Sequence, residues 1–386
     1  MSDILALKEL CEIEITDGTH KTPTYSESGY IFLSSKNVTT GEIDWDNVMY
    51  IPDWLHNELY SRISPQKDDI LLAKNGTTGV AAIVDRDEIF DIYVSLALIR
   101  PNKTKVLPRY LLHAINSEPS KRYFDGHLKG IGVPNLHLTH IRETPIKVPN
   151  FEKQIRVVNE LDKVTNLINK RKEQLSKLNE LVKVRFVELF GDPVKNDMGW
   201  ESKPLNEVCD GIGDGLHGTP VYDDGGEYPF INGNNLIDGK SVITPATKMV
   251  SEETYMKHFI DISTNAILIS INGTLGKLAF YNGEKVMLGK SACYCNLEQN
   301  INKVFVYGVM KSDSFAEFLD NSSTKSTIKN VGLKAMREYK LILPPTELQE
   351  QFTAFVEQTD KSKLEIQKSL EKLELLKKAL MQKYFG

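Results

Sequence analysis

Two copies of one short phrase bring acidic, imidazole and hydroxyl side chains together in this chain. The first copy reads DGTHKTP at residues 17–23, and the second reads DGLHGTP at residues 214–220. Histidine is the side chain most often used in general acid–base catalysis, so His20 and His217 are the first candidates for chemistry. Neither is accompanied by the partners of a catalytic triad, and the shared Asp, Gly, Thr and Pro are residues that shape turns. Each phrase therefore predicts a structured loop, in which the residues that differ between the copies could make different contacts.

A second stretch, NGEKVMLGKS at residues 282–291, looks like a phosphate-binding loop, in which backbone amides and a lysine hold a nucleotide. Five residues separate Gly283 from Gly289 where the motif has four, and the flanking residues alternate as in a strand where a helix should begin. The first half of the chain has no counterpart of this stretch, which argues against nucleotide binding. No residues have the spacing of metal ligands, so we expect no metal site and no catalysis in this chain.

The DGxHxTP phrases belong to a repeat that covers essentially the whole chain. Both halves contain a Phe/Asn/Gly element, an Asn-Gly-Thr-x-Gly loop and a terminal Phe-Gly in the same order, which is the pattern of an internal duplication. The corresponding ranges are 32–41 and 230–239, 75–79 and 272–276, 141–154 and 336–349, and 190–191 and 385–386.

The first part of each half alternates short apolar segments with Gly, Asn and Pro. Residues 70–84, for example, place apolar side chains at alternate positions on both sides of Asn75-Gly76, which predicts a β-hairpin. We therefore expect an α+β fold, in which residues 1–150 and 191–345 form two similar mixed α/β domains.

The second part of each half predicts one long amphipathic helix, over residues 151–190 and 346–386. Apolar residues recur there at spacings of three and four, and 40 helical residues span roughly 60 Å. We expect these helices to separate the domains and to pair as an antiparallel coiled coil. Charged residues at some seam positions, such as Arg171 and Lys377, indicate shorter paired stretches or contacts with another protein. The predicted seam consists of Leu161, Val164, Ile168, Leu175, Leu178, Val182, Val356, Ile366, Leu370, Leu373 and Leu380.

Composition adds few constraints on function. A formal charge of −5 means that any binding to nucleic acid would depend on locally gathered cations. No apolar run is long enough to cross a membrane, and the N-terminus lacks the features of a signal peptide. We expect a cytoplasmic protein without a membrane partner.

The order of these elements, repeated twice, resembles the specificity subunits of type I restriction–modification systems. The stretch LPPTELQEQFTAFVEQTDKSK at residues 343–363 carries much of this resemblance, whereas PNFEKQ at residues 149–154 lacks the second proline that is usual there. The resemblance implies a non-catalytic subunit that reads a bipartite site in double-stranded DNA, with one target-recognition domain for each part. It also implies that the helices dock two adenine methyltransferase subunits and that ATP-dependent restriction subunits join the assembly. S-adenosylmethionine, ATP and magnesium would then be bound by those partners and not by this chain.

Base reading requires polar side chains on loops, because these make paired hydrogen bonds to base edges, and phosphate contact requires cations. Positions that differ between the halves, such as Lys36 and Asn234, are expected to distinguish sequences, whereas shared asparagines are expected to shape turns. The candidates for DNA contact are His20, Lys21, Ser34, Ser35, Lys36, Lys74, Asn75, Thr77, Thr78 and Lys129 in the first half, and His217, Asn232, Asn234, Thr274, Lys290, Lys325 and Lys329 in the second.

A duplicated protein with long helices also fits another class, a non-enzymatic coiled-coil scaffold whose domains bind proteins. The divergence of polar loop residues within a shared framework favours the DNA-reading hypothesis.

Overall fold

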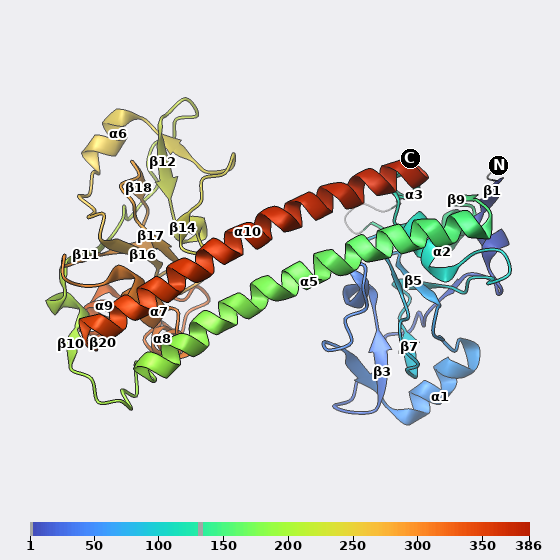
Figure 1. Ribbon diagram of the computed structural model, residues 1–386, viewed down its shortest axis with the longest axis horizontal. Helices are drawn as coiled ribbons and strands as arrows, with labels where there is room; N and C mark the ends of the chain where they lie inside the picture. Colours follow the sequence, from blue (N-terminus) through green and yellow to red (C-terminus); the bar gives the residue numbers. More distant parts are fainter. Residues whose placement is uncertain (1–2, 130–133) are drawn as a thin grey trace. The chain divides into compact units, whose positions relative to one another are not determined.

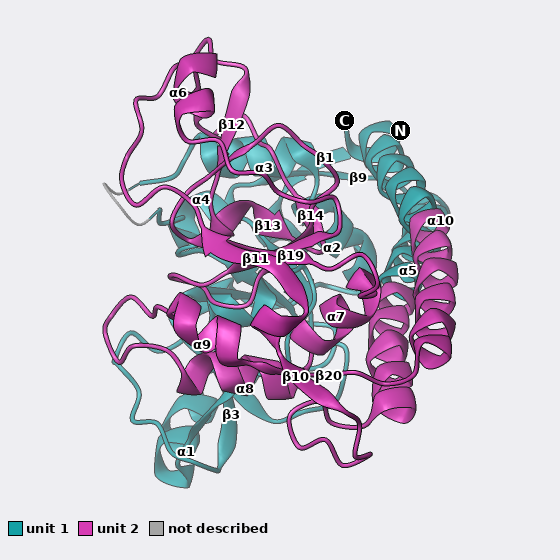
Figure 2. Ribbon diagram, turned by 90° about the vertical axis from the view of Figure 1, so that its left-hand side faces the viewer, with its two compact units in different colours: residues 1–172, 367–386 teal, residues 173–366 magenta. Residues whose placement is uncertain are grey.

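The computed structural model describes residues 3–129 and 134–386, which form two compact units (Figures 1 and 2). Unit 1 comprises residues 1–172 and 367–386, and unit 2 comprises residues 173–366. Each unit contains one globular domain and part of each long helix. The two long helices do not form a unit of their own. Residues 151–172 and 367–385 belong to unit 1, and residues 173–190 and 346–366 belong to unit 2.

A four-stranded antiparallel sheet forms the centre of unit 1. Its central strands have the sequences ILLA and LALI and are buried at every position. These are continuous apolar runs because both faces of the sheet are covered: Ile70 and Leu72 belong to one hydrophobic cluster, and Leu71 and Ala73 belong to another. The strand order is β2 (Thr16–Asp17), β8 (Leu96–Ile99), β5 (Ile70–Ala73) and β6 (Ala81–Ile83), and β5 with β6 is the predicted hairpin.

The remaining strands and helices of unit 1 surround this sheet. A three-stranded sheet has the order β4 (Met49–Ile51), β3 (Tyr30–Leu33) and β7 (Phe90–Ile92), with β3 parallel to β7, and β1 (Asp3–Ala6) pairs with β9 (Pro145–Val148). The helices are α1 (Asp53–Arg62), α2 (Pro108–Ile115), α3 (Glu118–Asp125) and α4 (Leu138–Arg142), and the 3-10 turns are η1 (Leu7–Leu10) and η2 (Ser35–Val38).

Unit 2 repeats this plan with different residues, which confirms the duplication. Its central sheet has the order β11 (Cys209–Asp214), β19 (Ala292–Leu297), β16 (Ala266–Ser270) and β17 (Leu278–Phe280), and its second sheet has the order β15 (Met249–Val250), β12 (Tyr228–Ile231) and β18 (Met287–Leu288). The strand pairs are β10 (Ser202–Pro204) with β20 (Lys340–Ile342) and β13 (Leu236–Ile237) with β14 (Lys240–Ser241). The helices are α6 (Glu252–Lys257), α7 (Lys303–Met310), α8 (Asp313–Asn321) and α9 (Leu333–Glu338), with 3-10 turns η3 (Leu205–Glu207) and η4 (Gly233–Asn235).

The long helices are α5 (Phe151–Phe190) and α10 (Thr346–Phe385), each drawn as one unbroken helix in Figure 1. In unit 1, the hydroxyl of Tyr384 near the end of α10 donates to Glu160 Oε2 near the start of α5, at 2.6 Å. In unit 2, the rings of Phe186 near the end of α5 and Phe352 near the start of α10 are 5.4 Å apart. Within each unit the two helices are therefore antiparallel, as predicted. No helix of the described chain is both long enough and apolar enough to span a membrane.

Every predicted seam side chain is buried or half-buried, and Leu161, Val164, Ile168 and Leu370 are the most enclosed. The charged seam position Lys377 is half-buried in unit 1. Burial lowers the pKa of its ammonium group, and the charge of Lys172 lowers it further. The equivalent seam position of unit 2 is Val182, so the seam is polar at this position in unit 1 and apolar in unit 2.

In each unit, an aromatic side chain at a helix end also packs against the globular domain. The three-and-four spacing of apolar residues did not identify these two side chains. The ring of Phe385 lies 5.4 Å from that of Tyr110 on α2, and the ring of Phe190 lies 4.8 Å from that of Phe305 on α7. Next to these contacts the units differ, because His113 of α2 belongs to a polar cluster with α5 in unit 1, whereas the equivalent position on α7 of unit 2 is Gly308, which packs against Phe186.

The polar cluster of unit 1 centres on Asp162. His113 Nε2 lies 2.8 Å from Asp162 Oδ1, and Arg109 Nη1 lies 3.3 Å from Asp162 Oδ2. Burial raises the pKa of the Asp162 carboxyl, but the hydrogen bond and charge of His113 and the charge of Arg109 outweigh burial, so the pKa is below its ordinary value. The ionised carboxylate therefore stabilises the contact between α2 and α5.

We expect Asp162→Asn to lower the free energy of unfolding by about 2 kcal/mol near neutral pH, since it removes the carboxylate charge and one of the two oxygens that contact His113 and Arg109. A carboxyl with a lowered pKa stabilises the fold above its ordinary pKa of about 3.9 and loses that effect as the pH falls through the folded-state value. Urea unfolding from pH 7 to pH 3 should show the difference from wild type narrowing in acid. Glu357→Gln, at the equivalent exposed position of α10, is the control and should change stability little. A deficit of the same size at every pH would contradict this role of the carboxylate.

Candidate nucleic-acid interface

The two DGxHxTP loops share an Asp–His pair and differ in what lies beneath it. In unit 1, His20 Nε2 lies 3.2 Å from Asp17 Oδ1, and in unit 2, His217 Nε2 lies 2.7 Å from Asp214 Oδ2. The carboxylates are largely enclosed, whereas the imidazoles are 70% and 60% exposed. Each aspartate therefore holds one ring nitrogen of its histidine and leaves the other at the surface. Lys21 is also exposed, with its ammonium 3.6 Å from Glu58.

Lys74 corrects one of the sequence-based assignments. Its side chain is only 8% exposed, and its Nζ lies 2.9 Å from Asp17 Oδ2. A buried ammonium needs such a partner, because desolvating an unpaired charge is costly. Lys74 is therefore a support of the first loop and not a surface for DNA. The equivalent position of unit 2 is the buried Ile271.

A tight turn between the two sheets of each unit connects the DGxHxTP loop to the loop of the 3-10 turn η2 in unit 1 or η4 in unit 2. In unit 2, the Ser291 hydroxyl accepts from Gly233 N at 2.9 Å and donates to Asn232 Oδ1 at 3.0 Å, while the Ser291 carbonyl accepts from Ile271 N at 3.1 Å. The preceding Lys290 N donates to Leu216 O at 3.0 Å. This turn therefore connects the DGxHxTP loop, the loop of η4 and the end of strand β16.

Unit 1 makes the same connections with Ser95. Its hydroxyl accepts from Ser35 N at 2.9 Å, its carbonyl accepts from Lys74 N at 2.9 Å, and the preceding Val94 N donates to Thr19 O at 3.0 Å. The sequence analysis missed this serine, although Ser95 and Ser291 lie at equivalent positions of the repeat. Val94 and Lys290 are equivalent as well, so the turn carries an exposed lysine in unit 2 alone.

The place of Gly289-Lys290-Ser291 in the fold agrees with the sequence argument against a phosphate loop. These residues join β18 to β19 and are followed by a strand and not by a helix. Because a phosphate loop needs the N-terminus of a following helix, this segment has no nucleotide-binding geometry.

The Phe/Asn/Gly elements form matching capped turns. Asn37 Oδ1 accepts from Ser34 N at 2.9 Å, and Asn235 Oδ1 accepts from Asn232 N at 3.0 Å. The shared asparagines thus shape the turns, and Ser34 and Asn232 are engaged within them. The variable residues Lys36 and Asn234 are both exposed at the same place of the framework.

The Asn-Gly-Thr-x-Gly loops each pair with a second, lysine-bearing loop. Asn75 bridges to Asn135, and Asn272 bridges to Asn330. Asn75 is half-buried, and its Oδ1 has no hydrogen-bond partner among the described residues. The threonines beside it, Thr77 and Thr78, are exposed and half-buried respectively, and Thr274 of unit 2 is exposed. Lys129, Lys325 and Lys329 are exposed in the paired loops, which places cations next to the polar tips.

A group of packed histidine and tyrosine rings lies near Lys129 in unit 1, and the sequence analysis did not identify it. The rings of His127 and His140 are 4.6 Å apart, and the rings of Tyr123 and His127 are 4.3 Å apart. Desolvation lowers the pKa of His140, and the charges of His127, Lys129 and His137 lower it further. The presence of three histidines within residues 127–140 could have pointed to this group in the sequence. Among the described residues, no group of histidine, cysteine or carboxylate side chains is arranged to hold a metal ion.

Comparison with known proteins follows from this geometry. The model for "Type I restriction modification DNA specificity domain" matches residues 2–178 and 198–377. The MjaVIII specificity subunit of Methanocaldococcus jannaschii is 26% identical over 189 residues, covering 47% of this chain and 44% of that protein. The putative MjaX specificity subunit of the same organism is 24% identical over 211 residues, covering 53% and 49%. The chain thus matches about half the length of these curated relatives.

Two solved structures have a similar fold over the whole chain. The type I restriction–modification S subunit from M. genitalium has a TM-score of 0.57 at 14% identity, covering 100% of this chain and 96% of that one. A structure described as showing complex assembly and conformational transition of the type I system has a TM-score of 0.56 at 17% identity, covering 100% and 97%.

The fold and its paired loops define a duplicated protein with two similar globular domains and two long helices. The match over both halves shows that the chain belongs to the type I restriction–modification DNA specificity family.

The turns at Val94-Ser95 and Lys290-Ser291, called the serine turns below, give a direct prediction for unit 2. Ser291→Ala removes the acceptor of the Gly233 amide, and a buried donor without a partner costs about 1–3 kcal/mol. We expect lower stability in urea and faster amide hydrogen exchange in the peptide that contains residues 230–236. Ser202→Ala, an exposed serine of β10 in the same unit, should leave both measurements unchanged. Unaltered exchange in the Ser291 variant would show that the hydroxyl does not hold the loop.

Proposed function

We propose that this chain is the DNA-specificity subunit of a type I restriction–modification complex and that it reads a bipartite, asymmetric site, with one half-site for each unit. One observation carries the proposal: the turns around Ser95 and Ser291 hold the loops of the two units by matching hydrogen bonds, and the loops expose different side chains. Lys36 occupies the place of Asn234, and Val94 occupies the place of Lys290. A shared framework with divergent polar positions is suited to reading two different sequences.

The exposed residue types support contact with base edges in the major groove. Lysine is suited to the O6 and N7 acceptors of guanine, and asparagine can bind the N6 and N7 positions of adenine in a bidentate manner. Lys36, Asn234 and Lys290 are therefore proposed as readers, together with His20, Lys21, His217 and the loop residues Ser35, Thr77, Thr78 and Thr274. Ser34, Asn75 and Asn232 act mainly through the turns that they shape.

Cations near these loops are proposed to bind phosphates, which positions the protein without specifying sequence. In unit 1 these are Lys129 and the exposed Lys121 and Arg122 of α3, and in unit 2 they are Lys325 and Lys329. Local clusters of this kind allow DNA binding by a chain with a formal charge of −5.

The long helices are proposed to dock two adenine methyltransferase subunits, with restriction subunits joining the assembly. Exposed apolar side chains outside the seam offer contacts, among them Leu167 and Leu375 in unit 1 and Leu181, Val184 and Leu364 in unit 2. S-adenosylmethionine, ATP and magnesium would serve those partners, and this chain would contribute recognition without catalysis.

Mapping of methylated adenines tests the reading of two half-sites. In cells that express this chain with its methyltransferase subunits, we expect methylation at one bipartite, asymmetric sequence. Lys36→Ala should relax or change one half of that sequence only, and Asn234→Ala should affect the other half only. Val221→Ala, an exposed position of unit 2 outside the proposed readers, is the control. Methylation without a bipartite sequence would refute the proposal, and a change in both halves from either variant would refute the assignment of one half-site to each unit.

The helices are further proposed to set the number of unread base pairs between the half-sites. Four residues inserted after Leu175 in α5, with four matching residues inserted after Ile366 in α10, add about 6 Å of helix. We expect a longer unread spacer or loss of methylation, whereas four residues inserted at the exposed turn after Gly283 should leave the spacer unchanged. An unchanged site in the helix-insertion variant would contradict a measuring role of the helices.

A further inference from the structure

One exposed loop of unit 2 presents a single large apolar side chain among polar residues. Residues 324–329 read TKSTIK, and all of them are exposed. Ile328 is 64% exposed. Single exposed apolar residues are common on protein surfaces, so its exposure alone carries no functional meaning. The setting of Ile328 gives its exposure a meaning, because the loop is held by hydrogen bonds, carries two lysines and belongs to the proposed recognition surface.

The base of the loop is fixed to the core of unit 2. Ser323 bridges to Val331, and the fully buried Val331 donates from its N to Ile271 O at 2.9 Å. The carbonyl of Lys329 accepts from Gly273 N at 2.9 Å. The loop is thereby attached to the Asn-Gly-Thr-x-Gly loop that presents Thr274.

Hydrogen bonds also stiffen the loop from within. Thr324 N donates to Asn330 O at 3.0 Å, and Asn330 N donates to Thr324 Oγ1 at 3.2 Å. The Ser326 hydroxyl donates to the carbonyl of Ile328 at 2.6 Å. The backbone of residue 328 is thus tied down while its side chain remains in solvent. Binding would bury Ile328 with little further loss of loop entropy, as expected of a preorganised contact.

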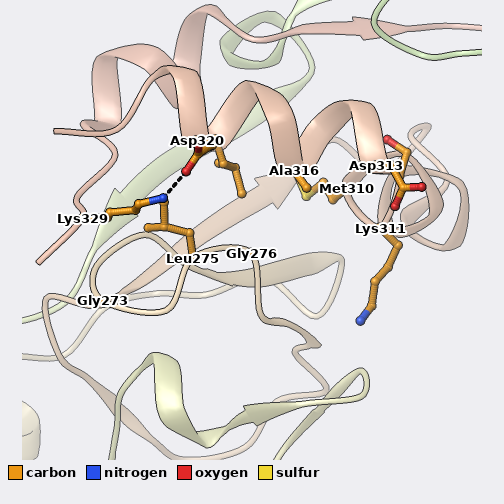
Figure 3. A pocket seen from close by; sticks show the side chains of 11 residues that line it. Gly273, Leu275, Gly276, Met310, Lys311, Asp313, Ala316, Asp320 and Lys329 are labelled. Atoms are coloured by element: carbon orange, nitrogen blue, oxygen red, sulfur yellow. Dashed lines mark hydrogen bonds and ion pairs between the residues drawn. The ribbon is translucent and has the colours of Figure 1, made fainter. Parts of the chain in front are cut away.

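Lysines flank the apolar side chain on both sides. Lys325 is exposed, and Lys329 pairs with Asp320 of α8 at the edge of a cavity of about 420 Å³ (Figure 3). Duplex DNA offers a complementary surface, in which charged phosphates border grooves that contain apolar groups such as thymine methyls and base faces. By sequence, the equivalent position of the first half is also apolar, Val133, which lies outside the described residues.

We propose that Ile328 contacts a base of the half-site read by unit 2, between phosphates bound by Lys325 and Lys329. Ile328 is then a specificity-determining residue, although it can form no hydrogen bond with its side chain. This inference rests on the proposed function and adds an apolar contact to the polar readers named above. A protein partner for the same side chain is the competing occupant.

Anisotropy titrations test the proposal with the complex of this chain and its methyltransferase subunits, on the duplex identified by methylation mapping and on a random duplex. Ile328→Ala should weaken binding to the cognate duplex about tenfold, since it removes most of the apolar surface that the Ile328 side chain would bury against the base. It should leave binding to random DNA unchanged. The slope of log Kd against log salt should also be unchanged. Lys325→Ala should instead weaken binding to both duplexes equally and reduce the salt slope by about one.

Ile328→Val keeps a branched apolar side chain and should lose less affinity than Ile328→Ala. Ile237→Ala, at a 46% exposed isoleucine of β13 in the same unit, is the matched control and should behave as wild type. Equal losses on both duplexes, no loss on the cognate duplex, or failure of the Ile328 variant to assemble with the methyltransferase subunits would overturn the inference. If the wild-type complex itself showed no preference for the cognate duplex, the proposed function would fail instead.

Discussion

Each unit of this protein is completed by the end of a helix that begins in the other unit. Phe385 of α10 packs with Tyr110 and the cluster around Leu161 in unit 1, and Phe190 of α5 packs with Phe305 in unit 2. An amphipathic helix of 40 residues has an apolar stripe that must be covered, and antiparallel pairing provides that cover within each unit. Each core can therefore form completely only when both long helices have formed and paired, because its last aromatic side chain comes from the far end of a helix.

The second level of organisation is the serine turn. Ser95 and Ser291 use the same atoms to hold the loops around them, so the loop backbones are supported by bonds that do not depend on the exposed side chains. Variation at Lys36 and Asn234, or at Val94 and Lys290, then changes the surface without changing the support. This separation of support from surface lets the two units present different chemistry on one plan.

The candidate site could be predicted only in part from residue types. Lys74 was assigned to DNA contact from the sequence, and this was wrong because its ammonium is buried beside Asp17. Nothing in the local sequence AKNG distinguishes a buried lysine from an exposed one, because its partner lies far away in the chain. The Gly289-Lys290-Ser291 segment was judged correctly from the sequence, because the strand-like alternation of its flanks already indicated that no helix follows.

The sequence by itself determined the duplication, the bounds of the long helices, the hairpin of residues 70–84 and the turn-forming role of Asn37 and Asn235. These features depend on local spacing and propensity, or on comparison of one half with the other. Only the tertiary structure decided that Lys74 is buried beside Asp17, that Ser95 and Ser291 connect the loops, and that the loop carrying Ile328 is attached to the core of unit 2. Those facts depend on contacts between segments distant in sequence, because burial and hydrogen-bond partners are set when the sheets and helices pack together.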